Sequence, residues 1–322
     1  MSQPYQKFIS DNINFILQET YLELPNSKVG KVRDSYTLDD SIVLVTTDRQ
    51  SAFDRNLASI PFKGAVLNLI SAYWFDLTKN IIPNHVVTIP HPNITIAKKV
   101  VIFPVEFIVR NYLTGSTSTS AWVNYNNGMR DFCGNILPES LVKNQKFTTP
   151  IITPTTKSDQ HDELISGEQI LQQGLMSKHD WDYVSAKALE LFNFASKKAF
   201  EHNLILVDTK LEFGKLEDGT IVAADEMFTP DSSRYWIADT YKERFENGQE
   251  PENIDKEFLR LWFMAHCDPY NDKILPEAPK DLIVELSSRY IQLYEMITNH
   301  NFPFPDVTKN IEEDIKNILN CL

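Results

Sequence analysis

Residues 204–225, LILVDTKLEFGKLEDGTIVAAD, constrain the fold more than any other part of the chain. The first half is rich in β-branched and aromatic residues, and its apolar and charged side chains alternate with the period of a β-strand. Asp218-Gly219, which lies between two apolar runs, indicates a tight hairpin turn. The sequence therefore predicts an antiparallel pair of strands here.

One face of the first strand carries three charges, because Asp208, Lys210 and Glu212 alternate with apolar residues. If the hairpin loop has two residues, Glu212 lies directly opposite Asp225 on the second strand. Two carboxylates so placed repel each other, and Mg²⁺ in phosphoryl-transfer sites is held by one or two carboxylates with water and substrate phosphates. The pattern leaves two interpretations open, a metal site or an ordinary solvated sheet face.

A second segment, IFPVEFIVRNYLTGS, carries groups that bind phosphate. Arg110 lies at the end of a predicted strand, and Gly115-Ser116 precede a predicted helix. The free N–H groups of a helix N-terminus attract anions, a hydroxyl adds a donor, and the guanidinium offers a bidentate fork. An ordinary helix cap is the alternative interpretation.

A third segment, KVGKVRDSY, places Lys31 and Arg33 on one face of a predicted strand after Gly30. These residues are candidates for covering a phosphate. The segment contains neither GxGxxG nor the spacing of a P-loop, so a solvated sheet edge is the alternative.

Composition narrows the class of protein. The 322 residues are 42% hydrophobic, with 31 Lys and Arg against 44 Asp and Glu, which gives a formal net charge of −13. This balance is typical of a soluble globular chain of about two domains, and it disfavours nucleic acid or an anionic membrane as a partner. The three cysteines form no zinc pattern, and the N-terminus has no apolar segment, so we expect a cytoplasmic protein.

Periodicity predicts helices and strands in a mixed order. We expect strands at 27–36, 41–47, 85–89 and 100–110, an irregular region at 131–160, and helices at 11–21, 65–79, 180–202, 255–266, 280–299 and 308–320. The composition of the sequence changes after Pro104, where the strand-like EFIVR is followed by the Gly/Ser/Thr-rich stretch TGSTSTSAW. This change predicts a first domain at 1–104 and a second at 105–322.

Two of these segments resemble a known family. IFPVEFIVRNYLTGS and LVDTKLEFG are similar to the two signature segments of the phosphoribosylaminoimidazole-succinocarboxamide synthase (SAICAR synthetase) family. GKVRDSY, TTDRQSAFD, TPTTKSDQHDE and ADEMFTPDSSRYW resemble the same family in the same order, and together the motifs span about residues 28–240.

The resemblance implies a fold and a reaction. The fold would be α/β of the α+β type and ATP-grasp-like, with two subdomains of mainly antiparallel sheets that sandwich ATP, and with a helical extension from about residue 241. The reaction would join L-aspartate to the carboxylate of CAIR, 5-amino-1-(5-phospho-D-ribosyl)imidazole-4-carboxylate, in de novo purine biosynthesis. ATP and Mg²⁺ would be required, an acyl phosphate would be the intermediate, and the enzyme would be a monomer or small homo-oligomer.

The resemblance also implies roles for individual residues. The N-terminal subdomain would cover the ATP phosphates, and the segment Ile102–Glu106 would be the hinge beside adenine. In this scheme the metal ligands are Glu212 and Asp225; the ATP-binding residues are Gly30, Lys31, Arg33, Phe103, Glu106, Lys210 and Glu212; the catalytic residues are Lys31, Lys210 and Asp208; and the substrate-binding residues are Asp54, Arg110, Ser116, Lys157, Asp159 and Arg234. Because the STSTS run is long, Ser118 or Ser120 could replace Ser116.

Two other functions remain open at this point. A small-molecule kinase of the inositol-polyphosphate type also uses an Asp-x-Lys segment, which Asp208-Thr209-Lys210 satisfies. Such a kinase would not require Arg110 and Gly115-Ser116. A non-catalytic nucleotide sensor would bind ATP without turnover.

Overall fold

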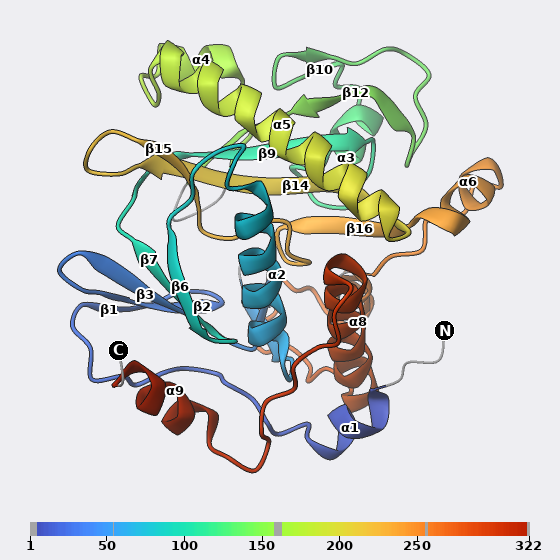
Figure 1. The fold of residues 1–322 in the computed structure, drawn as a ribbon. Coiled ribbons are helices and arrows are strands. Elements are labelled where there is room, and N and C mark those ends of the chain that lie inside the picture. The colour runs from blue at the N-terminus through green and yellow to red at the C-terminus, as the bar shows by residue number, and fades with distance from the viewer. Residues whose placement is uncertain (1–4, 54, 158–162, 255–256, 321–322) are drawn as a thin grey trace.

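A computed structural model describes residues 5–53, 55–157, 163–254 and 257–320. Figure 1 shows two antiparallel sheets, with helices over the upper sheet and between and beside the two sheets. The smaller sheet has the strand order β1-β2-β3-β7-β6. Its strands are β1 (Ser27–Val29), β2 (Arg33–Thr37), β3 (Ser41–Thr46), β6 (Val86–His91) and β7 (Ile94–Lys98).

The larger sheet has seven strands and is centred on β14. β9 and β8 pair with β14 along one edge, and β16 and β15 pair along the other. Its strands are β8 (Val101–Ile102), β9 (Val105–Tyr112), β12 (Lys146–Ile152), β13 (Thr155–Thr156), β14 (Leu204–Lys215), β15 (Ile221–Ala224) and β16 (Ser233–Ile237). Two small hairpins complete the strands, β4 (Arg49–Ala52) with β5 (Arg55–Ser59) and β10 (Asp131–Phe132) with β11 (Asn135–Ile136).

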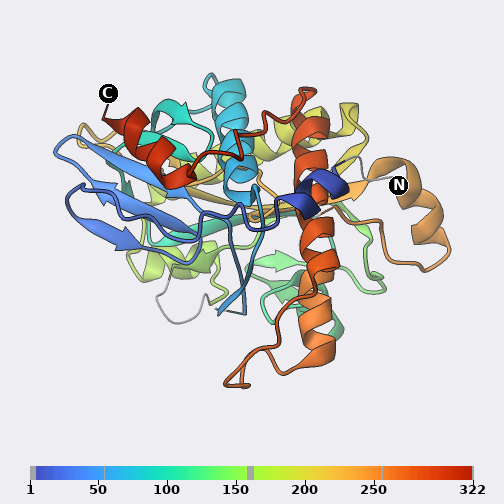
Figure 2. The same ribbon diagram turned by 90° about the horizontal axis from the view of Figure 1, so that it is seen from below.

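The helices cover the sheets on several sides. The longest, α5, packs on β14 and β9, while α2 packs against both α8 and the smaller sheet (Figures 1 and 2). The helices are α1 (Gln6–Asp11), α2 (Lys63–Thr78), α3 (Ala121–Asn126), α4 (Gly167–Gln172), α5 (Lys178–Glu201), α6 (Ala238–Glu246), α7 (Glu257–His266), α8 (Lys280–Thr298) and α9 (Ile311–Leu319). None of the helices in the described residues is both long and apolar enough to cross a membrane.

Alternating side chains give the smaller sheet two functional faces. Val43 and Val45 are buried in a core that includes Ile315 of α9. Ile42 and Leu44, the intervening residues of β3, line a cavity on the opposite face. The period of two that defines a strand therefore seals one side and leaves the other for a ligand.

Most of the long helices predicted from periodicity are confirmed, but the helix predicted at 11–21 is wrong. Residue 11 ends α1, residues 12–14 form a turn, and residues 15–21 form neither helix nor strand. The backbone N–H groups of Leu17 and Thr20 donate to the buried carboxylates of Asp48 and Asp34, each over 2.8 Å. Side-chain acceptors from distant parts of the chain therefore replace the helical hydrogen bonds. The region 131–160 is also more regular than expected, since β10 to β13 lie within it.

The predicted hairpin forms, but its register differs by one residue. β14 and β15 pair Glu212 with Ala224, whereas a two-residue loop predicted Asp225 in that place. The loop has three residues, 217–219; a backbone hydrogen bond of 2.9 Å joins the residues on either side, and Gly219 has a φ of +84°. A left-handed third residue is typical of three-residue hairpin loops, so the predicted opposition of Glu212 and Asp225 was wrong.

One large hydrophobic core joins the larger sheet to the helices, because apolar side chains of α2, β9, α5 and α8 belong to the same buried cluster. The buried strand residues of the smaller sheet, among them Val43, Val45 and Ile94, form a separate cluster. The sheets also touch directly, through a bridge between Asn84 and Ala223 and a 3.1 Å hydrogen bond from His85 N to Ala223 O. The chain changes from one sheet to the other between β7 and β8, and a division at Pro104 stays a prediction.

Candidate active site

The charged face of β14 is buried, not solvated. Asp208 and Glu212 are 5% and 4% exposed, and Lys210 is half-buried between them along the strand. Each of these charges has a partner of opposite sign from a neighbouring strand or loop, as described below. Two buried carboxylates and the half-buried lysine between them therefore line one strand face as a candidate site.

Lys210 lies between two carboxylates. Its Nζ is 2.7 Å from Glu212 Oε1 and 3.0 Å from Glu106 Oε1. The second oxygen of Glu212 accepts a hydrogen bond from Lys157, and Thr155 donates to the second oxygen of Glu106 over 3.1 Å. Burial lowers the pKa of Lys210, but Glu212 and Glu106 outweigh it and hold that pKa well above its ordinary value. Lys210 is therefore a permanent cation.

Asp225 connects the two sheets. It follows β15 with a left-handed φ of +64°, and its carboxylate pairs with Arg33 at the start of β2. Burial raises the pKa of Asp225, but Arg33, Lys210 and Lys157 hold it well below its usual range. The side chains of Arg33 and Asp225 keep 16% and 30% of their exposure, so a ligand can reach this pair.

A cavity of about 310 Å³ lies beside these charges. Glu212, Asp225 and Lys157 line it, and Lys98 and Lys99 add two further cations. The apolar part of the lining consists of Ile42, Leu44, Val100 and Ile102. An apolar slot whose lining also carries charged groups has the chemistry to hold a nucleoside and its phosphates.

The donor set fits Mg²⁺. No three carboxylate, imidazole or thiol side chains of the described residues gather as a complete metal site. Glu212 and Asp225 nevertheless present carboxylate oxygens to one cavity, and both are now held by cations, Lys157 and Arg33. One or two carboxylates are the protein ligands Mg²⁺ uses when substrate phosphates complete its shell.

The predicted phosphate-covering segment is a turn between β1 and β2. A Cβ on Gly30 would lie 2.7 Å from Arg33 O, so only glycine fits there. Arg49 holds the turn by donating to Gly30 O over 3.0 Å and to Lys31 O over 3.3 Å. The prediction that Lys31 and Arg33 share a strand face was wrong, because Lys31 lies in the turn and is exposed.

The predicted hinge lies where β8 meets β9. Ile102 lines the 310 Å³ cavity, whereas Phe103 belongs to the buried core and its ring lies 5.8 Å from Lys215 Nζ. Phe103 N donates to Phe213 O over 2.9 Å, which fixes this segment to β14. A direct role of Phe103 in ATP binding stays a prediction.

Asp208 lies between two arginines because of strand pairing. Its cross-strand neighbours are Arg110 on β9 and Arg234 on β16. Arg234 donates to it through Nε and Nη2, each over 3.0 Å, and Arg110 Nη1 lies 3.4 Å away. Burial lowers the pKa of Arg110 to about 10. A buried guanidinium and a half-buried one therefore converge on one carboxylate, and guanidinium groups are the bidentate partners of phosphate and carboxylate ligands.

A second cavity, of about 170 Å³, opens at this end of β14 and includes Lys210 in its wall. Thr117 and Thr119 line it, whereas Ser116 lines a neighbouring cavity and donates to Glu257 over 2.5 Å. Ser120 is buried, with its hydroxyl on Thr117 O at 2.6 Å. The choice among the serines stays a prediction; within the segment 116–120, Thr117 and Thr119 are the hydroxyl residues that line the arginines' cavity.

Three predicted substrate residues need comment. Asp54 and Asp159 lie outside the described residues. Lys157 is described, but it pairs with Glu212 and lines the larger cavity instead of the one beside Arg110. The structure therefore places Lys157 beside Glu212 and not beside Arg110.

Sequence analysis did not find His85. Its ring lines the 310 Å³ cavity and lies 5.1 Å from the ring of Phe75. Both ring nitrogens are buried without a hydrogen-bond partner among the described residues, and burial lowers the pKa of His85 to about 4. The sequence around this residue, IPNHVV, carries no signal that the histidine lines a cavity. The contact of residues 84 and 85 with Ala223 of β15 brings it there.

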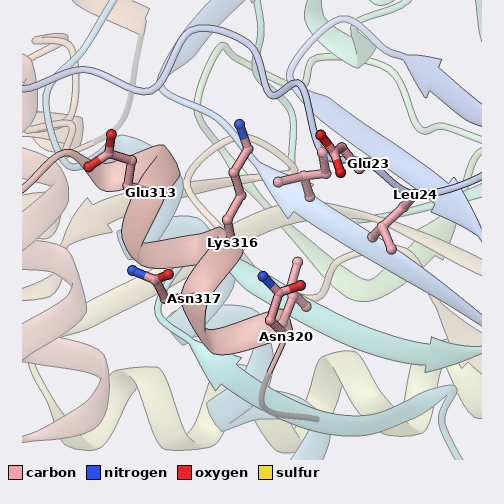
Figure 3. A pocket seen from close by; sticks show the side chains of 8 residues that line it. Glu23, Leu24, Glu313, Lys316, Asn317 and Asn320 are labelled. Atoms are coloured by element: carbon pink, nitrogen blue, oxygen red, sulfur yellow. The ribbon is translucent and has the colours of Figure 1, made fainter.

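Size alone does not identify the site. A cavity of about 450 Å³ lies between residues 22–24 and α9, where Lys316, Asn317 and Asn320 face it (Figure 3). It is remote from β14, and among the described residues none of its lining side chains carries a buried polar atom without a partner. The buried charged side chains lie at β14 instead.

Comparisons with known proteins identify the family of this chain. Residues 26–276 match the sequence family described as SAICAR synthetase. The phosphoribosylaminoimidazole-succinocarboxamide synthase of Legionella pneumophila (strain Paris) is 58% identical over 290 residues, covering 90% of this chain and 93% of that protein. The solved structure of SAICAR-synthase from Saccharomyces cerevisiae complexed with SAICAR is 32% identical, with a TM-score of 0.77 over 89% of this chain and 100% of that one. A type-2 SAICAR synthetase in complex with ADP, 24% identical with a TM-score of 0.66 over 87% of this chain and 100% of that one, supports the fold alone.

Proposed function

This chain belongs to the SAICAR synthetase family, and on that premise we propose that it joins L-aspartate to the carboxylate of CAIR, using ATP and releasing ADP and phosphate. The fold is the ATP-grasp-like arrangement that the sequence motifs implied. The relatives named above carry the name of this activity, and the yeast enzyme's structure contains SAICAR. We also propose that the enzyme acts in the cytoplasm, a location suited to a biosynthetic ligase that acts on small molecules.

The observation that carries the proposal is that one strand face serves both cavities. Glu212 lines the cavity with the apolar slot, Asp208 lines the cavity with the arginines, and Lys210 lies between them. Residues two apart on a strand are about 7 Å apart along it. A nucleotide at one end and a phosphorylated carboxylate substrate at the other would therefore meet at Lys210.

The first step would activate a poor electrophile. An oxygen of the CAIR carboxylate attacks the γ-phosphorus of ATP, the bond from that phosphorus to the bridging oxygen breaks, and ADP leaves with an acyl phosphate formed. Lys210 would face the negative charge of the transferring group. Lys157 and Arg33 would do so too, once they leave their ion pairs with Glu212 and Asp225. Mg²⁺ held by Glu212 and Asp225 would neutralise phosphate charge when bound.

The second step would form the amide. The amine of L-aspartate attacks the acyl carbon, the carbon–oxygen bond to phosphate breaks, and the nitrogen loses a proton as phosphate leaves. The two arginines on Asp208 would hold the ribonucleotide phosphate throughout. Most of the rate enhancement would come from orientation of the three substrates and from charge neutralisation.

One experiment separates this proposal from its rivals. The protein is incubated with ATP, CAIR and L-aspartate, alone and in each pair, and ADP and amide product are measured together. The proposal expects one SAICAR per ADP, and little ADP when CAIR is omitted. Release of ADP without an amide product would indicate a small-molecule kinase. ATP binding by calorimetry with no turnover in any mixture would indicate a nucleotide sensor.

A further inference from the structure

Arg260, a residue that the sequence analysis did not single out, lines the cavity beside Arg110 and Arg234. It comes from the first turn of α7, whereas the other two arginines come from strands of the larger sheet. Its side chain is 20% exposed, and its guanidinium carbon lies 5.5 Å from the centre of the Phe53 ring. The guanidinium of Arg260 is therefore the third in this cavity, and it also lies over the ring of Phe53.

The hydrogen bonding of Arg260 is incomplete. Nη1 lies 3.3 Å from Glu257 Oε2, and the other oxygen of Glu257 accepts from Ser116. Nε is buried, and no described residue accepts a hydrogen bond from it. A buried donor without an acceptor costs free energy, so such groups in a native structure call for an explanation.

The unused atom belongs to the edge of arginine that recognises carboxylates. Nε–H and the nearer terminal N–H point in parallel and match the two oxygens of one carboxylate. Arg110 and Arg234 already share Asp208, so they are committed to one charge centre. Arg260 is a separate cation in the same cavity, which is the arrangement expected where two different anions bind side by side.

We propose that Arg260 binds a carboxylate of L-aspartate and so places the amine beside the activated carboxylate of the ribonucleotide. This inference rests on the proposed function. Of the substrates in that reaction, the ribonucleotide supplies a phosphate for Arg110 and Arg234, and its own carboxylate is the group that is phosphorylated beside Lys210. The carboxylates left for Arg260 are therefore those of aspartate. A carboxylate held by two parallel hydrogen bonds fixes the amino acid's orientation, which a single charge contact does not.

The test measures each substrate's KM in Arg260→Gln and Arg260→Lys. Loss of a charge-assisted pair of hydrogen bonds raises the KM for aspartate by about 10- to 100-fold in Arg260→Gln. Arg260→Lys keeps the charge but loses the bidentate edge, so most of the rise remains. The KM values for ATP and CAIR stay within about 2-fold, because those ligands use other groups. Arg244→Gln on α6, an arginine outside the cavity, is the matched control.

A second readout separates binding from a structural role. Succinate, which is aspartate without its amine, inhibits the wild type in competition with aspartate, and its inhibition constant rises in parallel with the KM for aspartate in both variants. A rise in the KM for CAIR alone would assign Arg260 to the ribonucleotide phosphate and overturn the proposal. Unchanged constants in two folded variants would also overturn it. Failure of the wild type to form an amide would instead refute the proposed function.

Discussion

Lys63 and Asp231 form an ion pair of 2.8 Å in which the lysine side chain has no exposed surface. The lysine begins α2, and the aspartate lines the cavity of the three arginines. Tyr290 of α8 donates to the second oxygen of Asp231 over 2.8 Å. The C-terminal helix α8 therefore supports one wall of the substrate cavity through a buried carboxylate, which gives the C-terminal region a structural role.

Replacing Lys63 with methionine should destabilise the fold, because it leaves Asp231 buried without its cation. Removal of one partner of a buried pair costs about 3–5 kcal/mol. Urea unfolding measures this loss as a lower midpoint. Lys79→Met, which breaks an exposed pair with Asp76, is the control and should change stability by less than about 1 kcal/mol. Equal effects in the two variants would show that the buried pair is not special.

Glu212→Gln should lower kcat by at least about 100-fold while the fold stays intact, because a group that holds charge at the phosphates is lost. Its activity should also require more Mg²⁺ for saturation. Steady-state rates over a Mg²⁺ titration measure both effects, and circular dichroism checks the fold. Glu217→Gln in the exposed hairpin loop should behave as wild type. Near-normal turnover of Glu212→Gln at saturating Mg²⁺ would exclude Glu212 from the metal site.

Arg234→Gln should act on the ribonucleotide. It removes two 3.0 Å contacts to Asp208 and one of the two guanidinium groups that share that carboxylate. We expect the KM for CAIR to rise at least about 10-fold, on the scale of a hydrogen bond to a charged group, and the KM for ATP to stay within about 2-fold. Arg130→Gln, at a half-buried arginine outside this cavity, is the control. An equal rise for ATP would argue against separate cavities.

His85 should make stability depend on pH. Burial lowers its folded-state pKa to about 4, below the unfolded value near 6.5, so its contribution is complete above about pH 6.5 and is lost as pH falls toward 4. Wild type should therefore lose up to about 3 kcal/mol more stability than His85→Phe between pH 7 and pH 4. Urea unfolding at a series of pH values measures the difference. His179→Phe, at an exposed histidine, should follow the wild type.

The sequence by itself determined much of the local structure. The alternation in LVDTKLEFG identified β14 and its charged face, and apolar periodicity located α2, α5 and α8. Those patterns are local, because a strand or helix repeats its exposure every two or about 3.6 residues. The resemblance of ordered motifs identified the family, which residue-by-residue chemistry alone left open between a ligase and its alternatives.

Only the tertiary structure decided how distant charges meet. Asp225 reaches the site through a left-handed backbone and an ion pair with Arg33, not through the strand pairing that the loop signal predicted. A one-residue difference in loop length shifts every pair of opposed residues by one position, and nothing in Asp218-Gly219 fixes that length.

The same reason explains what sequence analysis misplaced or did not find. Lys157 was predicted to bind substrate but pairs with Glu212, 55 positions away in the chain, and Arg260, which was not predicted, enters the arginine cavity from a helix well beyond the motifs. Sequence periodicity records which side of its own element a residue occupies. Which other element lies against that side depends on the packing of the whole chain, so the three arginines and the charged floor of β14 become one site only in the folded protein.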